Sequence, residues 1–278
     1  MSLNVPYNSN LGVPLARGQT LTINGKFNDD AKVIEYNLLQ GGFDIGGSVQ
    51  AVLHAKINFG DKKIILNSYT NGAWGKEERH SISLKPGATY ELRIRVLDEH
   101  YSISADGVHI TDFAHRVPYE VTDRFQIKGD TTLEGVKWSG GIYQLPWQTG
   151  FQGGHLLEGQ TIELYAIPKG DRFSVDLVAR NQDLLFHFNP RFKDGVVVRN
   201  AHKNGFWEKE EREGAFPFHK NTGFSLKIVN ESYSIQIFVN GERFGTFQHR
   251  TPNPVGDYVG VRIDGEIELT DIAFTQQA

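Results

Sequence analysis

Hydrophobic and polar residues alternate over many short stretches of the chain, and this pattern predicts β-strands. Residues 90–96 place Tyr, Leu, Ile and Val at every second position with Glu and Arg between them, and residues 224–228 repeat the pattern with Phe, Leu and Ile. Because successive side chains of a strand point to opposite faces, each stretch predicts a strand with one buried and one polar face. The sequence contains no helical periodicity of useful length.

Turn-forming dipeptides separate the predicted strands. Asp106-Gly107, Asn240-Gly241 and Asp264-Gly265 are typical of two-residue hairpin turns. The 30 glycines are spread along the chain rather than clustered. Many short strands with frequent turns favour an antiparallel β-sandwich or jelly roll, so we predict an all-β protein.

One strand is predicted with particular clarity at residues 187–192, which read His-Phe-Asn-Pro-Arg-Phe. The two-residue period places His187, Asn189 and Arg191 on one face and apolar residues on the other. An imidazole, a carboxamide and a guanidinium are therefore expected side by side on the surface of a sheet.

A second polar group follows further along the chain. The Val-rich run at 196–198 leads to Asn200, and an Asn-Gly turn then leads to Trp207, Glu210 and Arg212. Glu210 and Arg212 share a face by the two-residue period. Trp207 can join them only if the chain bends before Glu210.

These side chains together have the chemistry of hydroxyl recognition beside an aromatic surface. Arginine offers only donors, glutamate only acceptors, and asparagine and histidine offer both, so the set can satisfy several neighbouring hydroxyls. A sugar ring has such hydroxyls, and it also has a face of C–H groups that can pack on an indole. The alternative, which stays open for each polar residue taken alone, is a solvated position on a half-exposed antiparallel sheet.

The order His-x-Asn-x-Arg, Val-x-Asn, Trp-x-x-Glu-x-Arg resembles the motif of the galectins, the β-galactoside-binding lectins. Every position is satisfied, by His187, Asn189, Arg191, Val198, Asn200, Trp207, Glu210 and Arg212. The resemblance implies a jelly-roll-like β-sandwich with a sugar site on its concave sheet. It also implies that the His, the first Asn and the first Arg bind galactose O4, and that the second Asn and the Glu bind O6. In the same way, the Glu and the last Arg reach the neighbouring sugar, and the Trp lies under the ring.

The chain contains this pattern twice. Five residues recur 133 positions earlier without a gap, namely His54, Asn67, Trp74, Glu77 and Arg79. Other short sequences also recur, such as Gly18-Gln19-Thr20 at Gly159-Gln160-Thr161, Tyr101-Ser102-Ile103 at Tyr233-Ser234-Ile235, and His115-Arg116 at His249-Arg250. A period this long indicates duplicated domains rather than a solenoid of small repeats.

We therefore predict two domains of the galectin fold in tandem. The ends of the repeat place an N-terminal carbohydrate-recognition domain at residues 1–138, a linker at 139–145 and a C-terminal carbohydrate-recognition domain at 146–278. A linker of this length spans at most about 25 Å, so we expect the domains to restrict each other. The first half also has a Gly-rich insertion at residues 41–47, interpreted as a plain hairpin connection, with a loop over the sugar groove as the alternative.

The first half departs from the motif at two positions. Lys56 stands where the first Asn is expected, and Asn58 stands where the first Arg is expected. Lysine can donate to a hydroxyl but cannot accept from one, and asparagine lacks the rigid fork of arginine. We expect the first site to differ in specificity or strength. The alternative is a first domain that has lost binding and serves as a scaffold.

Composition and charge exclude several other classes. The net charge of −4, from 29 basic and 33 acidic residues mixed along the chain, predicts no nucleic-acid or anionic-membrane partner. Without cysteine there can be no disulfide or Cys nucleophile, and we predict no cofactor or metal. The N-terminus lacks the pattern of a signal peptide, and no apolar run of about 20 residues could span a bilayer. We expect cytoplasmic synthesis, and the galectin resemblance implies leaderless secretion to the extracellular space.

A glycoside hydrolase is a competing interpretation. It would need two carboxylates about 5 to 10 Å apart, and Glu208 and Glu210 share a predicted face. Pairing with Arg212 would keep Glu210 ionised and unable to act as an acid, and the first half has Gly75 at the position of Glu208. We therefore predict no catalytic residues.

The predicted function is a bivalent lectin that binds β-galactoside glycans of the lactose or N-acetyllactosamine type. Two such sites would cross-link the glycoproteins or glycolipids that carry these glycans. An adhesion or scaffold protein that works independently of glycans is the alternative. It would explain the strands but not the duplicated Trp-x-x-Glu-x-Arg sequence.

Overall fold

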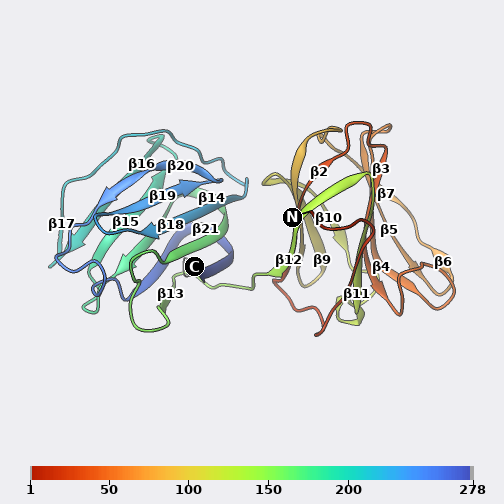
Figure 1. Ribbon diagram of the computed structural model, residues 1–278, viewed down its shortest axis with the longest axis horizontal. Coiled ribbons are helices and arrows are strands. Elements are labelled where there is room, and N and C mark those ends of the chain that lie inside the picture. Colours follow the sequence, from red (N-terminus) through yellow and green to blue (C-terminus); the bar gives the residue numbers. More distant parts are fainter. Residues whose placement is uncertain (1, 276–278) are drawn as a thin grey trace. The chain divides into compact units, whose positions relative to one another are not determined.

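The computed structural model describes residues 2–275, and the chain divides into two compact units that meet in sequence at Gly141 and Ile142. Strands make up both units, and among the described residues one short 3-10 helix, η1 (Tyr119–Val121), accompanies them (Figure 1). The predicted all-β class is confirmed.

Two antiparallel sheets form the first unit. One has the order β1-β11-β3-β4-β5-β6 with β7 also paired to β5, and the other has the order β10-β9-β8-β2-β12. The strands are β1 (Tyr7–Asn10), β2 (Thr20–Phe27), β3 (Val33–Gln40), β4 (Gln50–Asn58), β5 (Lys63–Thr70), β6 (Ala73–Trp74), β7 (Glu78–Ser81), β8 (Thr89–Val96), β9 (His100–Ala105), β10 (Val108–Ala114), β11 (Arg124–Gly129) and β12 (Thr131–Ser139).

The two sheets enclose a single core. Ile34 and Leu53 from the first sheet, together with Leu92 and Ile103 from the second, belong to one cluster of buried apolar side chains. Buried residues alternate with half-buried ones along β9, as expected of a strand with one face on a core. This arrangement is the predicted β-sandwich.

The second unit repeats the architecture with two longer strands. Its strands are β13 (Trp147–Gly150), β14 (Thr161–Val178), β15 (Leu184–Arg191), β16 (Val196–Lys203), β17 (Phe206–Trp207), β18 (Phe224–Asn230), β19 (Ser234–Val239), β20 (Glu242–Gln248) and β21 (Gly260–Thr275). The order is β17-β16-β15-β14-β18-β19-β20, and β21 pairs with both β13 and β14. Because β14 pairs with β15 through its last part and with β18 through its first part, it belongs to both layers.

The prediction of a hairpin turn at Asp264-Gly265 is wrong. Both residues lie inside β21, which pairs with β14 on either side of them. Gly265 has a φ of +101°, and a Cβ there would lie 2.7 Å from the Cα of Phe173. The glycine is needed because the strand bends from one layer to the other against a neighbouring backbone. Gly129, with a φ of +111° at the end of β11, occupies the same place in the first unit.

The other two turn predictions are confirmed. Asp106-Gly107 joins β9 to β10, Asn240-Gly241 joins β19 to β20, and all four residues have positive φ. The predicted match of Tyr101 with Tyr233 is out of register. Tyr101 lies opposite Val96 at the end of β8, and the residue opposite Asn230 at the end of β18 is Ile235 rather than Tyr233. Tyr101 is therefore buried in the core, while Tyr233 is exposed in the preceding turn.

Two connecting segments complete the path of the chain. The Gly-rich residues 41–47 connect the β3–β4 hairpin, as interpreted from the sequence. This loop is tied to the start of β11, because the Gly41 amide donates to the Asp123 carboxylate (3.1 Å). At the start of the second unit, Tyr143 and Leu145 are partly buried against its core.

We expect Phe188→Ala to destabilise the second unit by about 3 to 5 kcal/mol, because it leaves a cavity in the core. Phe188 is fully buried, and its ring lies 5.6 Å from that of Phe244. Urea denaturation of the intact chain, followed by circular dichroism, measures the effect. The matched control is Phe206→Ala, which removes a ring that is 77% exposed and should change the unfolding free energy by no more than about 0.5 kcal/mol. Equal midpoints for the two variants would contradict this account of the core.

Candidate functional site

A groove crosses the strands β14, β15 and β16 of the second unit. Its volume is about 570 Å³. The residues that line it are Arg172, Phe173, Ser174, His187, Asn189, Arg191, Val198, Asn200, Trp207, Glu210, Asp264 and Gly265. Seven of the eight residues singled out from the sequence are thus brought together, and the eighth, Arg212, contacts one of them, Glu210.

Strand register explains how residues from distant parts of the chain meet here. His187 on β15 lies opposite Asn200 on β16 and opposite Asp176 on β14. Arg262 on β21 lies opposite Asp176 in turn. Because directly opposed residues share one face of a sheet, these four side chains form a polar row across four strands.

The row fixes the hydrogen-bonding state of His187. Its Nδ1 makes a short hydrogen bond to the buried carboxylate of Asp176, which also accepts from the Ser174 hydroxyl (2.9 Å). A carboxylate can only accept, so Nδ1 carries the hydrogen. In the neutral imidazole, Nε2 is then the nitrogen that can accept a hydrogen bond from a ligand.

A chain of hydrogen bonds links the remaining polar residues. Asn189 donates from Nδ2 to the Phe173 carbonyl (2.6 Å) and accepts at Oδ1 from Arg191 Nε (2.8 Å). Arg191 also donates to Glu210 Oε1 (3.1 Å), and Arg212 donates to Glu210 Oε2 (2.7 Å).

Glu210 is consequently held in its ionised form. The hydrogen bond from Arg212, reinforced by the charge of Arg191, keeps the pKa of the Glu210 carboxyl below its ordinary value. An ionised carboxylate between two guanidinium groups is an acceptor of hydrogen bonds and a poor acid. The pairing of Glu210 with Arg212 that the galectin resemblance implied is therefore present in the structure.

Trp207 supplies an open aromatic surface at the end of the groove. Its side chain is 53% exposed, and its ring lies 4.7 Å from that of His187 and 4.9 Å from that of His202. It pairs with His202 across β16 and β17, so the bend expected between Trp207 and Glu210 is formed by the end of this two-residue strand. Such an exposed indole presents a flat apolar face to a ligand.

Several residues of the groove were not anticipated from the sequence. Arg172 and Ser174 come from β14, and Asp264 comes from the strand that was misread as a turn. Asp176 lies behind His187. The alternation Arg-Phe-Ser-Val-Asp at 172–176 was the available signal, since it places three polar residues on one face of a predicted strand.

The first unit builds the same row from different residues. His54 lies opposite both Asn67 and Asn37. Asn37 donates to Gln126 Oε1 (3.2 Å), so its own oxygen accepts from His54 Nδ1 (2.6 Å). The imidazole therefore has the same tautomer as His187. Trp74 is 48% exposed, with its ring 5.0 Å from that of His54.

In the next row of the first unit, lysine and glutamate stand where the second unit has asparagine and serine, and a lysine stands where it has an aspartate. Lys56 lies opposite Glu35, and Glu35 lies opposite Lys128 and forms an ion pair with it (3.1 Å). The corresponding positions of the second unit hold Asn189, Ser174 and Asp264. Burial is the largest cause of the lowered pKa of the His54 imidazole. Glu35 opposes that shift, and the two lysines reinforce it.

Asn58 does not take over the contacts of the arginine that it replaces. Its Nδ2 donates to Asp61 Oδ2 (3.1 Å), and its Oδ1 accepts from the Asp61 amide (3.1 Å). Glu77 keeps one arginine partner, because Arg79 donates to it from Nε (3.0 Å) and from Nη2 (2.8 Å). The Glu–Arg pair is thus common to both units, whereas the second arginine contact belongs to the second unit.

Residues 2–275 were also considered for two other kinds of feature, a membrane-spanning helix and a metal-ion cluster, and contain neither. No helix in this part of the chain has the length and apolarity to cross a bilayer. No cluster of three or more His, Asp or Glu side chains within it is arranged to hold a metal ion.

Comparisons with known proteins agree with the duplicated architecture. The family model described as galactoside-binding lectin matches residues 6–138 and again residues 146–274. The 32 kDa β-galactoside-binding lectin of Haemonchus contortus is 40% identical over 96% of this chain and 94% of its own length. A protein of the same name from Caenorhabditis elegans is 40% identical over 98% and 96%, and galectin-4 of Sus scrofa is 28% identical over 96% and 94%.

Both halves of the chain match the family model, and relatives at 40% identity are covered almost in full. The galectin fold predicted from the repeated motif is confirmed, and the chain belongs to the galactoside-binding lectins as a galectin with two lectin domains in tandem.

Proposed function

We propose that the groove of the second unit binds the galactose ring of a β-galactoside, with Trp207 under its apolar face. The observation that carries this proposal is the convergence of His187, Asn189, Arg191 and Glu210 around an exposed indole. Each polar group is already held by a neighbour, so little conformational entropy is lost when the ligand is ordered.

Selectivity for galactose follows from the donors and acceptors that remain. His187 Nε2 can accept from the axial O4 hydroxyl, and the remaining N–H groups of Arg191 and Asn189 can donate to it. A glucose ring, with an equatorial O4, would leave these groups without a partner. An unpaired buried polar group costs about 1 to 3 kcal/mol, which is sufficient to discriminate between the two sugars.

The adjacent sugar residue is proposed to contact the Glu210–Arg212 pair at the exposed side of the groove. Asn200 and Glu210 are proposed to bind the O6 hydroxyl. The lowered pKa of Glu210 supports binding rather than hydrolysis, because a carboxyl that stays ionised cannot protonate a glycosidic oxygen.

The first unit is proposed to bind a saccharide of different specificity. His54, Asn67, Trp74, Glu77 and Arg79 supply the counterparts of the second site. Lys56, which has no hydrogen-bond acceptor to offer, stands at the position that reads O4 in the second site. Its neighbour Glu35 gives this groove a carboxylate where the second groove has the Ser174 hydroxyl, and Lys128 gives it a cation where the second groove has the Asp264 carboxylate.

The proposed partners are glycoproteins and glycolipids that carry β-galactosides on the outer surface of cells. Because two domains lie in one chain, binding at one site raises the local concentration of ligand at the other. Affinity for a surface with many glycans can then rise by about 10² to 10⁴ over that of one site.

The first experiment measures lactose binding by titration calorimetry in a Trp74→Ala background, which leaves the second site as the reporter. We expect Trp207→Ala to weaken binding at least about ten-fold, because it removes an apolar contact worth about 1.5 to 3 kcal/mol. Phe206→Ala is the matched control, since Phe206 is the adjacent exposed aromatic residue and lies outside the groove. The proposal fails if the background variant gives no lactose signal, or if Trp207→Ala binds as well as the control.

For the first site, the double substitution Lys56→Asn with Asn58→Arg should move its glycan preference towards that of the second site. The reason is that it restores the amide and the guanidinium beside His54. A Trp207→Ala background and a glycan array provide the measurement, with Lys62→Asn on the neighbouring loop as the control. An unchanged profile would show that positions 56 and 58 do not contact the ligand.

Cross-linking should require both sites. We expect the intact chain to agglutinate erythrocytes, and we expect either Trp74→Ala or Trp207→Ala to abolish agglutination while the other site still binds immobilised glycan. Free lactose should compete for the second site. Full agglutination by a variant with one site would point to association between chains instead.

A further inference from the structure

Asn200 is held so tightly that only one part of its amide can reach a ligand. The residue is 1% exposed although it lines the groove. Its Oδ1 accepts from the Ala201 amide (2.8 Å) and from Arg250 Nη1 (2.9 Å), and its Nδ2 donates to the Glu208 carbonyl (3.0 Å). One N–H of Nδ2 is left without a partner among the described residues.

Arg250 supplies one of the three hydrogen bonds that set this orientation. It lies just after β20, and its guanidinium lies 4.7 Å above the ring of the fully buried Phe247. Since a guanidinium can only donate, it requires the oxygen of the Asn200 amide, rather than the nitrogen, to face it. The amide nitrogen is thereby directed away from Arg250.

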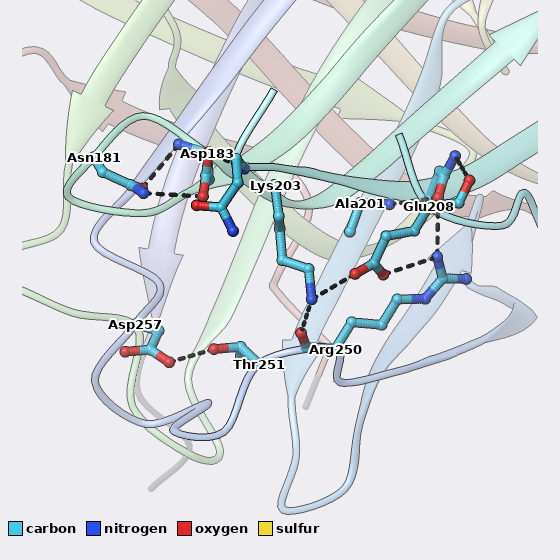
Figure 2. A network of polar contacts seen from close by, with 10 residues as sticks. Asn181, Asp183, Ala201, Lys203, Glu208, Arg250, Thr251 and Asp257 are labelled. Carbon is cyan, nitrogen blue, oxygen red and sulfur yellow. Dashed lines mark hydrogen bonds and ion pairs between the residues drawn. The ribbon is translucent and has the colours of Figure 1, made fainter. Parts of the chain in front are cut away.

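The same guanidinium fixes the segment that carries Glu210. Arg250 donates from Nη2 to Glu211 Oε1 (3.0 Å), and its Nη1 lies 3.5 Å from Glu208 Oε2. Lys203 holds the other oxygen of Glu208 (2.6 Å) and also donates to the Arg250 carbonyl (2.7 Å). Figure 2 shows the Glu208 carboxylate between the side chains of Lys203 and Arg250. Arg250 therefore contacts Glu208 and Glu211, which lie on either side of Glu210 in the chain.

An equivalent arginine occurs in the first unit. Arg116 donates from Nη1 to Asn67 Oδ1 (2.9 Å), and from Nη2 to the Lys76 carbonyl (2.7 Å) and to Glu78 Oε1 (2.9 Å). Its guanidinium lies 4.6 Å above the ring of Phe113, as that of Arg250 does above Phe247. Lys76 and Glu78 flank Glu77 on either side. The contact of an arginine with the Asn amide is therefore present in both units, although their grooves differ at other polar positions.

We propose that Arg250 and Arg116 are positioning residues for the recognition of the sugar hydroxymethyl group. Each arginine orients an Asn amide and holds the residues around the Glu, and these are the two side chains assigned to O6. The inference rests on the proposed function, because it concerns how the same groove selects its ligand. Neither arginine needs to touch the sugar.

Loss of the arginine would affect the O6 contacts selectively. Without Arg250, the Asn200 oxygen loses one of its two donors, and Glu208 and Glu211 lose the cation that they share, so the two side chains assigned to O6 are held less precisely. The O4 contacts of His187 do not depend on Arg250, because His187 is held by Asp176 on the neighbouring strand β14. The substitution should therefore weaken the binding of a ligand without the O6 hydroxyl less than it weakens the binding of lactose.

The test compares lactose with its 6-deoxygalactose analogue by titration calorimetry, using the full chain in a Trp74→Ala background. With Arg250 intact, we expect lactose to bind about ten-fold more tightly than the analogue. Arg250→Met should reduce that ratio to about one, and Arg250→Lys, which keeps one donor for Asn200, should give an intermediate ratio. Lys227→Met is the control for loss of one positive charge, because Lys227 forms its ion pair within residues 2–275 with Glu163 on β14, and it should leave the ratio unchanged.

The ratio separates positioning from general destabilisation, which would weaken both ligands equally. A ratio that stays near ten-fold in a folded Arg250→Met or Arg250→Lys protein would overturn the inference, whatever the absolute affinity. If Arg250→Met does not fold, the Arg250→Lys ratio decides. Absence of lactose binding in the background protein itself would instead reject the proposed function.

Discussion

The groove depends on one constraint, which is that polar side chains buried in a sheet must keep their hydrogen bonds. His187, Asn189 and Asn200 are each bonded to a residue of a neighbouring strand or loop before any ligand arrives. A buried group that lost its partner would cost more than an average hydrogen bond contributes. The hydrogen bonds within the protein therefore take up most donors and acceptors of these side chains. The few donor and acceptor atoms that remain determine which ligand groups the groove can bind.

The sequence predicted the residues of the site better than it predicted their supports. Strict alternation at 187–192 and the spacing from Trp207 to Arg212 were sufficient to find most of the groove residues on β15 and after β16, because these lie close together in the chain. Asp176 on β14 and Arg250 after β20 contact His187 and Asn200, at separations that local periodicity does not detect. Their roles follow only from the pairing of β14 with β15 and from the position of the residues after β20.

The fold was predicted from local alternation and turn-forming dipeptides, and the one turn that was misread has a clear cause. An Asp-Gly pair favours a hairpin because glycine adopts positive φ at little cost. At Gly265 that same freedom serves a bend inside β21, where Arg172 and Phe173 leave no space for a Cβ. Local propensity identified the unusual backbone, but tertiary contacts decided whether the chain reversed or continued.

The charged row of Lys56, Glu35 and Lys128 has a consequence for how duplicated domains diverge. A lysine at position 56 lies beside a carboxylate on β3, which is itself paired with a lysine on β11. A change at one position of such a grid alters the charge that its neighbours face, so substitutions on three strands are coupled rather than independent. The row through His54 differs between the units in the same coupled way, because Asn37 and Gln126 stand on adjacent strands where the second unit has Asp176 and Arg262. Divergence between the duplicated domains is therefore a property of neighbouring strands taken together rather than of single positions.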